Sequence, residues 1–102
     1  LLDGVTITEG NADGSDNHKY GGGMYNKSSS PTLTNVTISK NSSNGGGGGI
    51  SNFLYSSPIL NNVTISENTT IGVGGGILNH SSSSPILTNI TMSGNSARLT
   101  GG

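Results

Sequence analysis

Apolar and polar residues alternate strictly in several short segments of the chain. In "NVTIS", Val36 and Ile38 alternate with Thr37 and Ser39, and the same pattern returns twice further along. A period of two with β-branched residues is typical of a strand that has one apolar and one polar face. A short apolar element precedes each of these segments, and another follows the next glycines. The pattern therefore predicts an all-β protein with about three short strands in each repeat.

The alternating segments belong to a repeat. Pro31, Pro58 and Pro85 lie 27 residues apart, and they are followed by "TLTNVTISKN", "ILNNVTISEN" and "ILTNITMSGN". A glycine block returns in the same phase, as "GGGMYN", "GGGISN" and "GGGILN". The run of five glycines at 45–49 contains one of these blocks. We therefore interpret this run as a repeat element and not as a flexible linker.

A unit of this kind has too few apolar residues to bury a core of its own. Stacking successive units buries the inward side chains between layers, which is the principle of a solenoid. We predict a parallel β-helix of about four coils, over 2–32, 33–59, 60–86 and an incomplete coil at 87–102. Residues 11–20 lengthen the first repeat and are expected to form an insertion loop that projects from it.

Asparagine returns at three positions of the repeat. Its amide can pair with the equivalent amide one layer away, and its backbone tolerates the left-handed conformation of a tight corner. We expect three structural ladders of stacked side chains: Asn35, Asn62 and Asn89; Asn41, Asn68 and Asn95; and Asn26, Asn52 and Asn79.

Two short motifs resemble a known family. "GGGM" and "GGGI" are similar to the GGA[ILV] element, and "ISKN", "ISEN" and "MSGN" to the FxxN element, of polymorphic outer-membrane protein and related adhesin repeats. The resemblance covers essentially the whole chain, with Gly in place of Ala and with Ile or Met in place of Phe. It implies a right-handed parallel β-helix and a location outside the cell or on the bacterial cell surface.

Composition narrows the classes of partner. The formal net charge is −1 with four Lys and Arg residues, so we expect no nucleic acid partner, which would need a basic stripe. No apolar run is long enough to cross a bilayer, so we expect no membrane insertion by this segment. The absence of cysteine argues against a disulfide framework and suits a cytosolic or a bacterial surface location.

The outward positions of the best strand carry hydroxyls. Thr and Ser stand where an acid–base enzyme would need carboxylates, so we expect no catalytic residues, no enzyme activity and no cofactor. The Thr-x-Ser face is similar to the Thr-x-Thr faces of β-solenoid ice-binding proteins, although the strand propensity of Thr explains these residues without any ligand and is the interpretation that we favour. This candidate surface-recognition face consists of Thr37, Ser39, Thr64, Ser66, Thr91 and Ser93.

The insertion loop contains oxygen donors that calcium could use. They are Asn11, Asp13, Asp16 and Asn17. The loop lacks the glycine and the distal glutamate of an EF-hand loop, and a solvated turn accounts for the same residues. We therefore predict no metal site and retain these four residues as calcium candidates.

These observations favour a structural role. We expect a rod, stalk or filament segment of an extracellular, adhesin-like bacterial surface protein, whose open ends continue into further coils or self-associate. Host-surface or polysaccharide ligands are further candidate partners. Two alternatives remain open: an ice-binding solenoid, and a polysaccharide-binding or processing β-helix whose active coils lie outside this segment.

Overall fold

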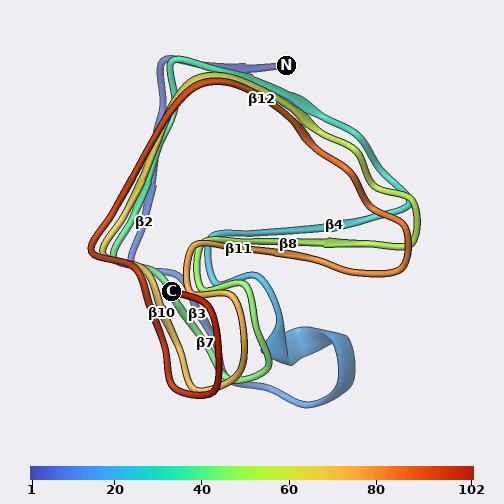
Figure 1. Cartoon of the computed structure of the whole chain (residues 1–102), viewed down its shortest axis with the longest axis vertical. Helices are drawn as coiled ribbons and strands as arrows, with labels where there is room; N and C mark the ends of the chain where they lie inside the picture. Colours follow the sequence, from blue (N-terminus) through green and yellow to red (C-terminus); the bar gives the residue numbers. More distant parts are fainter.

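The chain folds into a right-handed parallel β-helix of about four coils (Figure 1). The computed structural model describes all of residues 1–102 except the side chain of Asn17. Figure 1 looks along the helix axis, which is the shortest dimension of the molecule at 20 Å. One 3₁₀ turn, η1 (Asp16–Lys19), projects from the first coil within the expected insertion.

Three parallel sheets run along the stack. The first contains β1 (Leu2–Asp3), β2 (Thr6–Thr8), β5 (Thr32–Thr34), β6 (Thr37–Ser39), β9 (Ile59–Ser66) and β12 (Ile86–Ser93). The second contains β3 (Asn11–Ala12), β7 (Ser42–Ser43), β10 (Thr69–Thr70) and β13 (Ser96–Ala97). The third contains β4 (Met24–Lys27), β8 (Ile50–Phe53) and β11 (Ile77–Asn79). Equivalent residues of successive coils are paired throughout, so every row of side chains runs parallel to the helix axis.

The first sheet joins two elements that the alternation pattern separates. β9 runs through both, although Asn62 within it has a φ of 53°. Asn35 and Asn89 have the same left-handed conformation, so the sheet bends along one row of asparagines. The asparagine row is therefore a corner inside a sheet: the register skips Asn62 and Asn89 and resumes at Val63 and Ile90 on the far side.

The second sheet has no counterpart in the pattern of apolar residues. Its strands are two residues long and contain small or polar residues. Ser43, which is buried, donates from Oγ to Thr70 Oγ1 at 2.9 Å. Small side chains lie here because this part of the coil is narrow, and hydroxyl pairing satisfies the polar groups that point inward.

The core is a stack of aliphatic side chains from the two middle coils. These residues are at most 1% exposed: Leu33, Val36, Ile38, Ile50, Leu60, Val63 and Ile65. Five partly buried residues pack against them, four from the first and last coils and Ile77 from the third coil: Leu2, Ile7, Met24, Ile77 and Ile90. Each coil supplies a thin layer, so burial depends on the coils above and below it.

The glycine block marks where successive layers approach most closely. Gly47 has a φ of 63°, which favours glycine. A Cβ on Gly48 would lie 2.5 Å from the backbone oxygens of both Gly75 and Thr69. Side chains are therefore excluded at Gly48 by the neighbouring coil, and the glycine-rich run is part of the folded stack.

Candidate functional site

The most buried asparagine row lies inside the coil beside the first and second sheets. Asn68 is 0% exposed, and its Nδ2 donates to Asn95 Oδ1 at 3.0 Å and to the Ile38 carbonyl at 2.9 Å. Its Oδ1 accepts from the backbone N–H and the side-chain amide of Asn41, both at 3.0 Å. Every donor and acceptor of this amide is used, and the bonds join three successive coils.

A second inner ladder follows the third sheet. Asn26 Nδ2 donates to Asn52 Oδ1, and Asn52 Nδ2 donates to Asn79 Oδ1, each at 2.9 Å. The next corner carries a serine ladder that the sequence analysis missed, in which buried Ser56 accepts from the Ser29 N–H at 3.0 Å. The serines before each proline were the signal for it, since they recur with the repeat.

The third asparagine row lies on the exposed corner of the first sheet. Asn62 Nδ2 donates to Asn35 Oδ1 at 2.6 Å, and Asn89 Nδ2 donates to Asn62 Oδ1 at 3.1 Å. Asn35 Nδ2 donates in turn to Asp3 at 3.3 Å. All three predicted rows are thus hydrogen-bonded along the axis, two of them inside the coil and one facing solvent.

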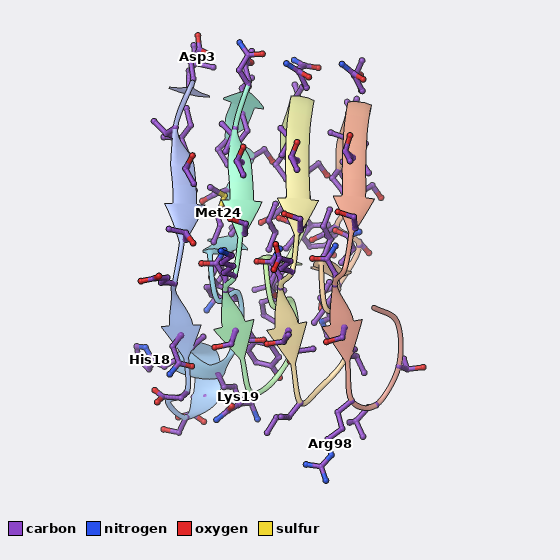
Figure 2. The ribbon with its side chains drawn as sticks, turned by 90° about the vertical axis from the view of Figure 1, so that its left-hand side faces the viewer. Asp3, His18, Lys19, Met24 and Arg98 are labelled. Carbon is purple, nitrogen blue, oxygen red and sulfur yellow. The ribbon has the colours of Figure 1, made fainter. Side chains whose placement is uncertain are left out.

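The Thr-x-Ser face forms a regular array on the outside of the first sheet. Figure 2 views the four coils from the side that carries it. The paired residues are Thr6, Thr37, Thr64 and Thr91 in one row and Thr8, Ser39, Ser66 and Ser93 in the other. Thr91 and Ser93 are exposed, and the corresponding residues of the middle coils are half-buried. Ice binding by this array stays a prediction.

The calcium candidates contact different parts of the structure. Asn11 lies in β3, where its Oδ1 accepts from Ser42 Oγ at 3.1 Å and its Nδ2 donates to Asp13 Oδ2 at 3.3 Å. Asp16 begins η1 and lines a groove beside the third sheet. The Asn17 side chain lies outside the described part of the structure. Asn11 therefore joins two coils, while Asp16 faces a separate surface feature.

The first and last coils expose residues that are core in the middle of the stack. Leu87 and Met92 are each 46% exposed, whereas their partners Leu60 and Ile65 are 0% exposed. At the other end, Val5 is 40% exposed, whereas Val36, which occupies the same row in the second coil, is 1% exposed. Within the described residues, β3 and β13 form the two edges of the second sheet. Both end faces thus present apolar side chains together with sheet edges, which favour pairing with further strands.

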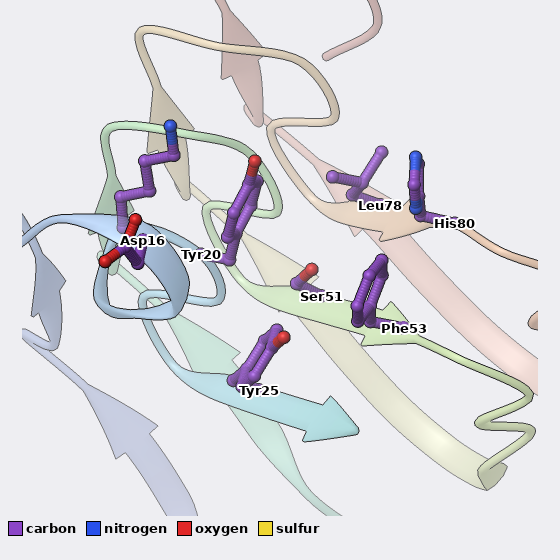
Figure 3. Close-up of a pocket in the computed structure, with 8 residues that line it drawn as sticks. Asp16, Tyr20, Tyr25, Ser51, Phe53, Leu78 and His80 are labelled. Atoms are coloured by element: carbon purple, nitrogen blue, oxygen red, sulfur yellow. The ribbon is translucent and has the colours of Figure 1, made fainter. Parts of the chain in front are cut away.

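A groove of about 370 Å³ lies on the outer face of the third sheet, beside η1 (Figure 3). It contains Tyr20, Tyr25 and Phe53, which are three of the four Tyr and Phe residues of the chain. Burial and, second to it, the charge of Tyr20 raise the pKa of Tyr25, so this phenol stays protonated at neutral pH. The groove is not predicted from the sequence, although strand alternation places Tyr25 and Phe53 on the outward face.

Neither a metal-binding cluster nor a membrane-spanning helix is found in the described residues. No three His, Cys, Asp or Glu side chains gather into a metal-binding group in the part that the structure describes. Among the same residues, no helix is long and apolar enough to span a membrane.

The fold defines the protein as a β-solenoid repeat protein. No family model, curated protein or solved structure matches the chain. Function must therefore be inferred from the surfaces of the stack: its end faces, its hydroxyl array and its aromatic groove.

Proposed function

We propose that the chain is a structural rod segment, forming part of a stalk or filament of an adhesin-like protein on the bacterial surface. The single observation that supports this role is the exposure of core residues at both end faces. Leu87 and Met92 occupy rows whose members in the two middle coils are fully buried, so a further coil stacked on Leu87 and Met92 would bury them equally. Such a coil comes either from the same polypeptide or from another copy.

The stack is well suited to bear load along its axis. Backbone hydrogen bonds, asparagine ladders and aliphatic rows all run from coil to coil. The near-neutral charge keeps repulsion between stacked copies small. The four coils measure 29 × 26 × 20 Å and are wider than they are tall, so an elongated rod requires more coils on the same axis.

The test is end-to-end assembly of the chain. Sedimentation velocity and electron microscopy at increasing protein concentration are expected to show oligomers that grow along the helix axis. Met92→Glu places a carboxylate on the apolar end face and should prevent this growth, because burying an unpaired charge is costly. Thr91→Glu is the matched control, since Thr91 is exposed on the same strand but points outward.

The two variants separate end-face stacking from other association. Oligomers that persist in Met92→Glu, or that disappear equally in Thr91→Glu, would exclude stacking through this face. A wild-type chain that stays monomeric at every concentration would exclude the filament. The stalk then predicts that an added copy of residues 60–86 lengthens the stack and raises its melting temperature.

A further inference from the structure

Two pairs of stacked rings border the groove on the third sheet (Figure 3). The ring centroids of Tyr20 and Tyr25 are 6.4 Å apart, with their planes at 22°. Those of Phe53 and His80 are 5.2 Å apart, with their planes at 23°. The rings come from three different coils and from the insertion, so the groove exists only in the folded stack. Each pair holds its rings in place for contact with a ligand.

Polar groups lie between the two ring pairs. The strand register places Ser51 between Tyr25 and Leu78, and the Ser51 residue is 2% exposed. His80 Nδ1 is 2.7 Å from Ser81 Oγ, which leaves Nε2 as the ring nitrogen for a ligand. The hydroxyl of Ser51 can donate and accept, and so can the imidazole, depending on its tautomer. The groove thus combines apolar ring surface with a few fixed polar atoms, as small-molecule sites do.

The charges at the edge of the groove balance each other. η1 contributes Asp16 and Lys19, one of each sign, to the lining. Lys19 Nζ already lies 5.6 Å from the centroid of the Tyr20 ring, where it acts as the cation over that ring. The two opposite charges give this edge no net charge, so neither an anionic nor a cationic ligand gains a net electrostatic attraction. The lining therefore favours an uncharged polar ligand.

We propose that this groove binds a short, uncharged oligosaccharide. The C–H face of a sugar ring packs on the electron-rich faces of Tyr25 and Phe53, and sugar hydroxyls bond to Ser51 and His80. A volume of about 370 Å³ lies within the range of small-molecule sites. This recognition function goes beyond the structural role proposed above and does not depend on it.

The test is titration of the full chain with defined sugars. Isothermal titration calorimetry uses cellotetraose, maltotetraose and chitotetraose as probes, with choline and inorganic phosphate as charged comparisons. We expect at least one of the sugars to bind. Phe53→Ala should then lower the affinity about tenfold or more, as loss of a central aromatic contact does. Phe53→Tyr should retain binding, and Tyr55→Ala is the control, because Tyr55 is 74% exposed and lies outside the groove.

A second readout covers the case in which Phe53→Ala disturbs the fold. Saturation-transfer NMR on the unmodified chain should carry signal from the aromatic protons to the ring protons of the sugar. Absence of binding by every sugar, binding of choline or phosphate in their place, or sugar binding that Phe53→Ala leaves unchanged would each overturn the proposal. Met92→Glu should bind sugar normally, so the outcome is independent of end-to-end assembly.

Discussion

At the scale of single residues, the asparagine amide connects the coils because it can donate and accept at the same time. Asn68 shows this best, since its four hydrogen bonds reach Asn41, Ile38 and Asn95. Asn68→Asp is expected to lower the free energy of unfolding by at least about 3 kcal/mol at pH 7. The change removes the donor to the Ile38 carbonyl and introduces a buried carboxylate. Chemical denaturation measures the loss.

The same variant should respond to pH in a defined direction. Burial raises the pKa of the introduced carboxyl above its unfolded value of about 3.9. Below that value the carboxyl is protonated in both states and can donate to Ile38, so the destabilisation is smallest there. It grows as pH rises. Asn62→Asp is the matched control on the exposed ladder, where solvent hydrates the charge. An equal loss at both positions would contradict the role assigned to burial.

Glycine is required at single positions where the backbones of successive coils leave no room for a side chain. Gly48→Ala would place a Cβ 2.5 Å from backbone oxygens of two neighbouring segments. These backbone oxygens cannot rotate away from the new Cβ as a side chain could. We therefore expect the free energy of unfolding to fall by about 3 kcal/mol. Thermal unfolding followed by circular dichroism measures it. Gly94→Lys is the control, because Gly94 shares its corner row with Lys40, which has a φ of 57°. A Gly48→Ala variant as stable as Gly94→Lys would refute the close approach of the layers.

At the scale of strands, the alternation of apolar and polar residues predicts the sheets that have apolar inward side chains, but it does not predict the sheet whose inward side chains are small and polar. The first sheet follows from rows such as Leu33 and Leu60, and the third from the row of Ile50 and Ile77, because their apolar side chains mark the inward face. The second sheet does not, because Ser43 and Thr70 satisfy their inward hydroxyls by pairing with each other across coils. Such pairing depends on the stack and leaves no period of two in the sequence.

The aromatic groove illustrates the same limit. Alternation places Tyr25 and Phe53 on the outward face, but it does not show that Tyr20 from the insertion stacks on Tyr25 and lines the same groove. The length of the insertion is visible in the sequence, whereas the direction in which it folds is not. The asparagine rows were accessible because each repeats with the period of the coil. Features made once, by a single coil, could not be predicted in this way.

The row of leucines gives an element-scale prediction. Leu60→Ala is expected to lower the free energy of unfolding by about 3 kcal/mol, because Leu60 is 0% exposed and its coil has neighbours on both sides. Leu87→Ala, in the same row, should cost about 1 kcal/mol in the monomer, since Leu87 is 46% exposed. Urea denaturation at low protein concentration compares the two. Equal costs would mean that the last coil is already covered in solution.

At the scale of the whole molecule, stability and assembly should be linked. A copy stacked on the last coil binds the folded chain and not the unfolded one, so it stabilises the fold by mass action. We expect the melting temperature to rise by about 5 °C for each tenfold increase in concentration above the dissociation constant. Met92→Glu should melt at a temperature independent of concentration, and Thr91→Glu should behave as the unmodified chain. Differential scanning calorimetry across a concentration series measures this. A concentration-independent melting temperature in all three would contradict assembly of separate copies through this end face and would exclude the filament.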